Sequence, residues 1–309
     1  MTEVPPMLSR LFLLLLCLAL PAGPALAQQV TPSHVYQVAE EIWLDLERMH
    51  LANFSHAGTA PRETAPRRPR HVLQKAREVH RKLQVLRFVN GLDVQQLPPP
   101  AVKEVTPGDV LEVLQHLRAG LDGLHGAYGL EDPLEEVALP AGKTPTDVYN
   151  RLVQIDASLD ALGLPPVVPN DVYRLAETLR GELLLLSGNP ATSQPDPRDM
   201  MALVQRTPAD AYAEAKALLA DLRSLGEAGR YAVPGGVVLP DDRPAPIRPG
   251  DVLHEISVIL AEVSAMKAVA NRREPMARAP FQGGMTPNEV WNSLSLSREL
   301  VAGLSAAEG

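Results

Sequence analysis

The residues best suited to chemistry in this sequence recur at one fixed place in a repeated motif. Eight prolines each begin a similar segment, and the third position of each segment, counting the proline as the first, holds a histidine or an acid. In the first four segments these residues are His34, His71, Asp109 and Asp147. Imidazole and carboxylate groups together bind divalent transition metals. The four residues would therefore form a metal site if the starts of their segments met.

The last four segments place only acids at the third position, namely Asp171, Asp210, Asp251 and Glu289. Four carboxylates in one place would repel one another unless a cation such as calcium lay among them. A simpler interpretation covers all eight residues. An acid in the first helical turn faces the positive end of the helix and can bond back to the preceding cap, so each residue would serve only its own helix.

The fifth position of the segments is aromatic in five of the eight copies: Tyr36, Tyr149, Tyr173, Tyr212 and Trp291. Amphipathic aromatic side chains suit ligand pockets, so these residues are candidate ligand-binding residues at one end of a helical bundle. The alternative is a packing collar, in which loops lie against the helix starts.

The motif around these residues predicts helix starts. In Thr144-Pro145-Thr146-Asp147 the threonine can accept a free backbone N–H as the N-cap. The proline then occupies the first helical position, where its missing N–H has no cost. Threonine precedes four of the other prolines in the same way, and the copies at Pro69, Pro169 and Pro249 lack it.

Apolar residues follow each proline at positions 4, 8, 11, 15 and 18, except that the last copy has Ser297 at position 11. The copy at Pro145 has Val148, Leu152, Ile155, Leu159 and Leu162 at these positions. Steps of three and four residues place these side chains on one face of an α-helix. We therefore predict an all-α protein with eight proline-initiated helices whose apolar faces form its core.

The spacing of the motif prolines divides the chain into two groups. Prolines 32, 69, 107 and 145 lie 37 or 38 residues apart, whereas Pro169 follows Pro145 by only 24 residues. Steps of 39, 41 and 38 residues then resume. Helices three and seven both begin with Pro-Gly-Asp-Val-Leu, at Pro107 and Pro249. The pattern predicts a tandem duplication of a four-helix bundle unit, with residues 28–164 and 165–309 as the two units.

The loops between the predicted helices are long, at about 15–20 residues, whereas antiparallel neighbours need only a few. A loop of that length can run back along a whole helix. The helices of a unit could therefore all point the same way, and periodicity does not choose between parallel and antiparallel packing.

The second predicted helix, which starts at Pro69, is strongly basic. It carries Arg70, Lys75, Arg77, Arg81 and Lys82 on the face away from its apolar stripe. A solvated outer face is the simpler interpretation. The alternative is a surface that contacts an anionic partner.

The N-terminus predicts export. Residues 1–27 are typical of a signal peptide, because Arg10 precedes the apolar run from Leu11 to Leu20 and Ala25-Leu26-Ala27 provides a cleavage pattern. The run is too short for a stable anchor, so we expect no transmembrane segment after cleavage. The single cysteine, Cys17, lies in this segment. We therefore expect a periplasmic or secreted protein without disulfides or cysteine-ligated cofactors.

No enzyme motif stands out. The sequence has no P-loop, dinucleotide-binding fingerprint, nucleophile elbow or His-Glu-x-x-His pattern. The formal net charge of −8 argues against general nucleic-acid binding. We expect an exported, non-enzymatic helical-repeat protein that acts as a binding or scaffold module, with a protein of the cell envelope as its partner. The alternative is a small-molecule or metal-binding sensor that uses the helix starts. Apart from that possible divalent metal we expect no cofactor.

Overall fold

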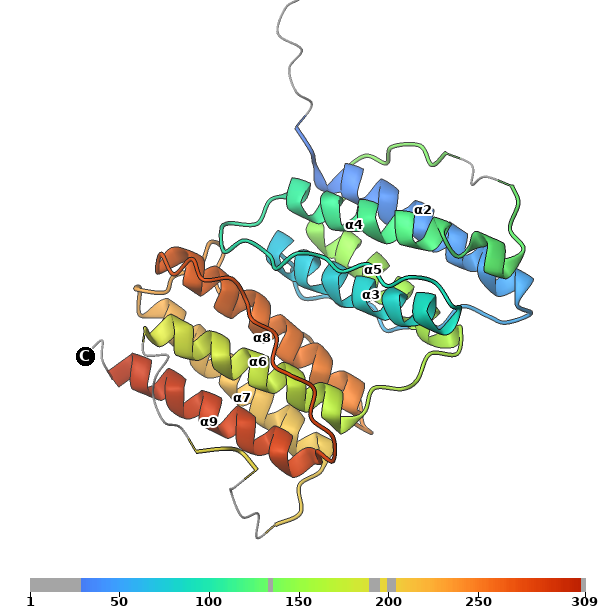
Figure 1. Cartoon of the computed structure of the whole chain (residues 1–309). Helices are drawn as coiled ribbons and strands as arrows, with labels where there is room; N and C mark the ends of the chain where they lie inside the picture. The colour runs from blue at the N-terminus through green and yellow to red at the C-terminus, as the bar shows by residue number, and fades with distance from the viewer. Residues whose placement is uncertain (1–28, 133–135, 189–194, 199–203, 307–309) are drawn as a thin grey trace, which may run out of the picture. The chain divides into compact units, whose positions relative to one another are not determined.

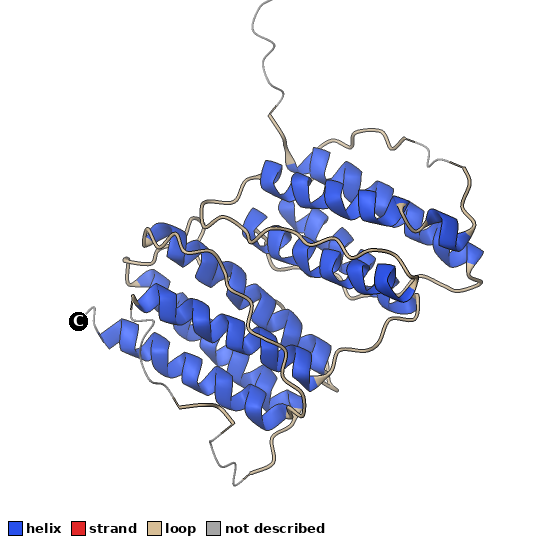
Figure 2. Cartoon of the chain, viewed as in Figure 1, coloured by secondary structure: helices blue, strands red, loops and turns tan. Residues whose placement is uncertain are grey.

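Helices form all the regular secondary structure in the part of the chain that the structure describes. The computed structural model describes residues 29–132, 136–188, 195–198 and 204–306, and no strand occurs among them (Figure 2). The helices, labelled in Figure 1 except for η1, are α2 (Pro32–Ala52), α3 (Pro69–Val89), α4 (Pro107–Asp122), η1 (His125–Tyr128), α5 (Pro145–Ala161), α6 (Pro169–Ser187), α7 (Pro208–Glu227), α8 (Pro249–Val269) and α9 (Pro287–Ala306). The predicted all-α fold with eight proline-initiated helices is confirmed.

The predicted signal peptide, residues 1–27, lies outside the described residues. Among the helices that are described, none combines the length and the apolar character that crossing a membrane requires.

Each α-helix begins at its motif proline because the motif supplies the cap. At the start of α5, Thr144 Oγ1 accepts a hydrogen bond from the backbone N–H of Asp147 at 3.3 Å. Asp147 Oδ2 in turn accepts hydrogen bonds from the Thr144 backbone N–H at 2.9 Å and from the Thr144 hydroxyl at 2.7 Å. These bonds from Thr144 lower the pKa of Asp147. Two donors that would otherwise lack partners are thereby satisfied.

The caps allow a paired stability test. Replacing Thr144 by alanine should lower the free energy of unfolding by about 1 kcal/mol, because the Asp147 N–H loses its acceptor. Replacing Val168, the uncapped residue before Pro169, by threonine should raise it by up to about 1 kcal/mol. Urea unfolding of both variants measures the two changes. A neutral Val168→Thr variant would contradict the capping argument, because threonine keeps the β-branched shape of valine.

The apolar stripes form the core as predicted. The five stripe residues from Val148 to Leu162, the last of them just after α5, are all buried, and the same motif positions after Pro107 and Pro208 are buried as well. The helices from α6 to α9 share a continuous hydrophobic cluster. Ser297 interrupts the stripe of α9 but is fully buried, and its hydroxyl donates to the Ser293 carbonyl oxygen at 2.8 Å. That bond satisfies the hydroxyl inside the core.

Within each group of four the helices run parallel. The Lys143 N–H before α5 donates to Ser33 Oγ at the start of α2, at 3.3 Å, so these two helices start at the same end. The Arg67 N–H before α3 likewise donates to Thr146 Oγ1 of α5, at 2.9 Å. Near the other end, Lys82 of α3 pairs with Asp160 of α5. The long loops make this arrangement possible because each returns the chain to the starting end.

The two groups share their packing and several of their contacts. Helix α2 packs against α4 and α5 as α6 packs against α8 and α9. The Met285 N–H donates to Asn170 at 2.8 Å, and both residues lie at the motif positions that Lys143 and Ser33 occupy in the first group. The shared contacts are those that a tandem duplication would leave. The duplication itself, and the division into residues 28–164 and 165–309, stay predictions.

Helices α3 and α8 also pack against each other, and they join the two groups. We call this contact, with the loops beside it, the seam. The expectation of a solvated basic face on α3 is wrong for Arg70 and Lys75, which are buried. Burial alone would lower the pKa of Lys75, but Asp156 and Glu78 raise it. The face of α3 that points away from its own group is covered by α8 of the other group. The apolar pattern of α3 alone does not show that a second group packs there.

Candidate anion-binding groove

The seam is anchored by a buried carboxylate of α8. Glu262 Oε2 accepts a hydrogen bond from Arg70 Nε at 2.9 Å, and its Oε1 accepts one from the Val238 N–H at 3.0 Å. His71 Nε2 lies 2.7 Å from the same Oε1. Burial alone would raise the pKa of Glu262, but the hydrogen bond from His71 and the charge of Arg70 lower it. Glu262 is therefore ionised at neutral pH.

His71 caps α3 and bonds to α8 at the same time. Its Nδ1 accepts a hydrogen bond from the Arg68 N–H at 2.9 Å, so in the neutral ring Nε2 carries the proton and donates to Glu262. Burial lowers the pKa of His71, which favours this neutral form. Capping α3 and bonding to α8 thus use the two nitrogens of one imidazole.

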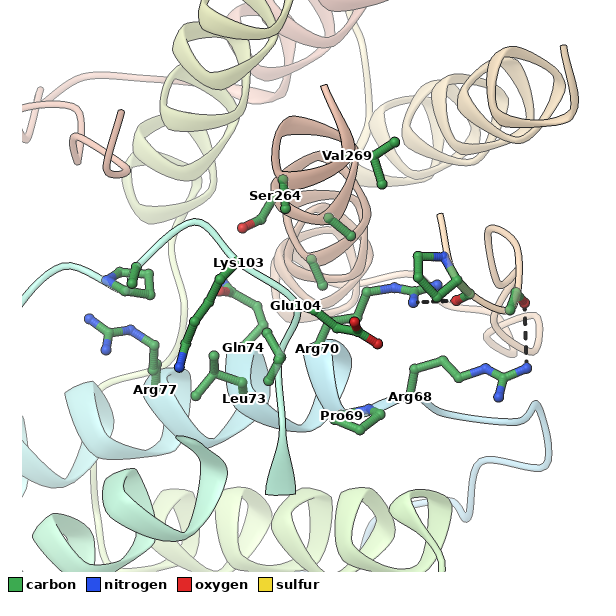
Figure 3. Close-up of a pocket in the computed structure, with 18 of the residues that line it drawn as sticks. Arg68, Pro69, Arg70, Leu73, Gln74, Arg77, Lys103, Glu104, Ser264 and Val269 are labelled. Atoms are coloured by element: carbon green, nitrogen blue, oxygen red, sulfur yellow. Dashed lines mark hydrogen bonds between the residues drawn. The ribbon is translucent and has the colours of Figure 1, made fainter. Parts of the chain in front are cut away.

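Beside this anchor the seam opens into a groove of about 470 Å³. Figure 3 shows α3 on one side of the groove and α8 on the other, with the loop that carries Lys103 and Glu104 between them. Its apolar lining comes from Leu73 of α3, from small residues of α8 including Ala261 and Ala265, and from prolines and alanines of the loops. The size is that of a small-ligand site.

Positive charge dominates the groove lining. The charged residues that line it are Arg68, Arg70, Arg77, Lys103, Arg273 and Glu104. Arg70 is paired with Glu262, and Lys103 with Asp109 at 2.6 Å. The other three arginines donate to backbone carbonyl oxygens: Arg68 to Gly235, Arg77 to Pro98 and Arg273 to Val102.

A carbonyl oxygen carries no formal charge, so these three guanidinium groups have no ion-pair partner among the residues that the structure describes. Burial lowers the pKa of Arg77, and the charge of Arg81 lowers it further. Both effects disfavour the cation, and an anion nearby would relieve them. Positive guanidinium groups around an apolar floor form a site that can hold an anionic group with apolar atoms beside it.

The predicted metal residues act as helix caps. His34 Nδ1 lies 3.2 Å from the Thr31 backbone N and 2.8 Å from its hydroxyl, and Asp109 accepts from the Thr106 N–H at 2.7 Å. His71 and Asp147 cap α3 and α5 as described above. Although the helices are parallel, no three of these four residues bring ligand atoms within 4.8 Å of one another in the described chain. Their metal role stays a prediction, and the geometry supports capping.

The fifth-position aromatics lie where loops meet the helix starts. Arg67 stacks on the Tyr149 ring at 4.6 Å, and Arg206 stacks on the Trp291 ring at 4.0 Å. These two contacts occupy equivalent motif positions in the two groups. The Tyr212 hydroxyl accepts a hydrogen bond from the Arg243 N–H at 3.1 Å. Tyr173 is buried within the hydrophobic cluster of α6 to α9. Such contacts are those of a packing collar.

Tyr36 is different because it lines a cavity. This helix-start pocket of about 250 Å³ is formed by Tyr36, Ala60, Pro61, Arg62, Lys143, Asp147, Asn150, Arg151 and Gln154. Lys143 lies over the Tyr36 ring at 4.1 Å, and Arg151 donates to its hydroxyl at 3.1 Å. Tyr36 and Asp147 are thus two predicted site residues that the fold brings to one pocket.

Sequence reasoning missed the groove because its walls come from distant segments. Arg70 and Glu262, which anchor it, are 192 residues apart. The only sequence feature that pointed to the groove was the basic character of α3. The sequence does not show that α8 forms the other wall.

Comparisons with protein-family models, with curated proteins and with solved structures find no match to this chain.

Proposed function

We propose that this chain is an exported, non-enzymatic binding module of the cell envelope that holds an acidic segment of a partner protein in the groove of the seam. The observation that carries the proposal is that three groove arginines have no carboxylate partner among the described residues: Arg68 and Arg77 donate to backbone carbonyl oxygens, and Arg273 donates to one and to the Asn271 side-chain oxygen. Acidic side chains would supply the missing carboxylates. Apolar side chains between them would pack on the floor formed by Leu73 and the alanines of α8.

The export part of the proposal rests on the sequence of residues 1–27. The binding part rests on the groove, and the two parts are tested separately. Fractionation of cells that express the whole chain, with N-terminal sequencing of the product, tests export. Recovery of the uncleaved chain from the cytoplasmic fraction would contradict it.

Peptide binding tests the groove. A fluorescein-labelled peptide with alternating glutamate and leucine should bind the purified chain, and its affinity should fall as salt is raised. Arg77→Ala and Arg273→Ala should each weaken binding roughly tenfold, because each removes a charge-assisted hydrogen bond. Fluorescence anisotropy measures the affinity of the native chain, its dependence on salt and the affinity of each variant.

The controls for this test are a peptide and a variant. A lysine–leucine peptide should not bind. Arg223→Ala should leave binding unchanged, because Arg223 is an exposed arginine of α7 that is paired with Glu227 and lies outside the groove lining. If the acidic peptide fails to bind, or binds Arg77→Ala and Arg273→Ala as well as the native chain, the proposed role of the groove is wrong.

A second candidate function is supported by the helix-start pocket. The pocket combines Tyr36 with Arg62, Lys143 and Arg151, a set that suits a small carboxylate. The chain would then be a small-molecule sensor that uses the helix starts. A rise in melting temperature with small carboxylates, lost in Lys143→Ala, would favour the sensor. A melting temperature that does not respond would leave the groove as the recognition site.

A further inference from the structure

Three potential metal ligands meet at the far end of α2 and α4. Asp45 is on α2, Asp122 is the last residue of α4, and His125 begins η1. One ligand atom from each residue lies within 4.8 Å of the other two. None of the three residues lies at the third or fifth position of the repeated motif.

The geometry is close to that of a coordination shell. His125 Nε2 and Asp45 Oδ2 are in direct hydrogen-bond contact, and Nε2 lies 4.0 Å from Asp122 Oδ1. Ligand atoms at about 2.0–2.2 Å from a tetrahedral ion are roughly 3.3 Å apart. Small side-chain movements would therefore bring the three atoms to coordinating distance, and an ion would replace the proton shared by Asp45 and His125.

The surroundings orient Asp45 and leave Asp122 open to solvent. Arg48 donates to Asp45 Oδ1 at 3.3 Å and also to the Asp132 carbonyl oxygen, so Arg48 occupies one carboxylate oxygen and the other faces His125. The Asp45 side chain is 5% exposed, whereas that of Asp122 is 57% exposed. An ion could enter past Asp122. The end of α4 also favours a cation, because the last carbonyl oxygens of a helix carry partial negative charge.

The second group has an ion pair, and no set of potential metal ligands, at the equivalent motif positions of the described chain. Counting each motif proline as the first residue, Asp45 and Glu182 are both at position 14, and His125 and Lys267 are both at position 19. Lys267 Nζ donates to Glu182 at 2.7 Å and to the Glu274 carbonyl oxygen at 2.8 Å. Ser264 stands at the position of Asp122. The second group has a lysine side chain where the first has an imidazole, and it lacks the additional carboxylate.

We propose that Asp45, Asp122 and His125 bind a divalent transition metal ion. One imidazole nitrogen and two carboxylate oxygens suit zinc and its neighbours, with water in the fourth position. Calcium, which takes six to eight oxygens, fits this set poorly. The ion would link α2 to the end of α4 on the side of the first group away from the helix starts.

The test is titration of the tag-free, purified chain with zinc and cobalt by calorimetry and visible absorption. We expect one ion per chain, with the cobalt bands of a four-coordinate nitrogen–oxygen site. His125→Lys reproduces the Lys267–Glu182 pair and so should keep the fold, but it should lower zinc affinity at least a hundredfold. Asp122→Asn should weaken binding at least tenfold.

The matched control is His116→Ala, which removes an exposed histidine of α4 and should leave zinc affinity unchanged. Circular dichroism and melting curves establish that each variant folds. If the native chain binds no ion, or if His125→Lys binds zinc as tightly as the native chain, the three residues are an ion pair with a neighbouring acid and the proposal is overturned.

Discussion

Replacing Glu262 by glutamine should lower the free energy of unfolding by about 3–5 kcal/mol, the cost of leaving a buried charge without its partner. Glu262 is fully buried and receives donors from Arg70, His71 and Val238. The glutamine NH₂ group would face at least one of these donors, and Arg70 would lose its counter-charge. Because these contacts join the two helical groups, the seam should loosen before either group unfolds.

Glu255 provides a matched control on the same helix. It is also a buried glutamate, but burial raises its pKa to about 7, and its Oε1 has no hydrogen-bond partner in the described chain. Glu255→Gln at pH 6 should therefore change the free energy of unfolding by less than about 1 kcal/mol, because it replaces a largely neutral group by another. Urea unfolding followed by circular dichroism measures both variants. Equal losses for the two would contradict the assignment of Glu262 as the ionised anchor.

The lowered pKa of Glu262 sets how its contribution to the free energy of unfolding changes with pH. Its contribution to stability is fully present above about pH 4.5, the value of an unfolded glutamate. The contribution is lost as the pH falls through the lower folded value, where the carboxylate takes up a proton.

Stability should also fall on acidification because of buried histidines. Burial lowers the pKa values of His50, His71, His80 and His254, and that of His80 to about 4. Below pH 6.5 the unfolded chain therefore binds more protons than the folded chain. Each such histidine lowers the free energy of unfolding by up to about 1.4 kcal/mol per pH unit until its folded pKa is reached.

Two buried glutamates oppose this trend over part of the range. Burial raises the pKa of Glu255 to about 7 and raises that of Glu182 above its ordinary value, so above pH 4.5 and below these raised values the folded chain holds protons that the unfolded chain releases. That offset ends below pH 4.5, where both states are protonated at these groups. The four histidines outnumber the two glutamates. Stability should therefore decline from pH 6.5 downward and fall most steeply below pH 4.5.

Two variants separate these contributions when urea unfolding is repeated from pH 7.5 to 4. His80→Leu removes one titrating histidine and should reduce the slope by about 1.4 kcal/mol per pH unit between pH 6.5 and 4. Glu255→Gln removes one opposing group and should make the slope steeper between pH 7 and 4.5. A native chain whose stability rises toward pH 4, or a His80→Leu variant with an unchanged slope, would contradict this account.

The sequence reveals some candidate site residues but not which of them lie together. The third-position residues were found because they recur, and their capping role follows from contacts within one turn. The groove and the Asp45–Asp122–His125 cluster could not be found in the same way. Asp122 and His125 are three residues apart at a helix end, but Asp45 lies on another helix, and no local pattern pairs them.

Where the helices begin and which stripe of each enters the core could be predicted from the sequence, and the spacing of the prolines predicts two groups of four helices. These properties depend on interactions between residues one to four positions apart, and such interactions leave a readable period. Three outcomes could not be predicted from the sequence: that the helices of a group are parallel, that α3 and α8 join the groups, and that Arg70 and Lys75 are buried. Those outcomes depend on which surfaces of separate helices meet, and the 192 residues between Arg70 and Glu262 leave no periodic trace of that pairing.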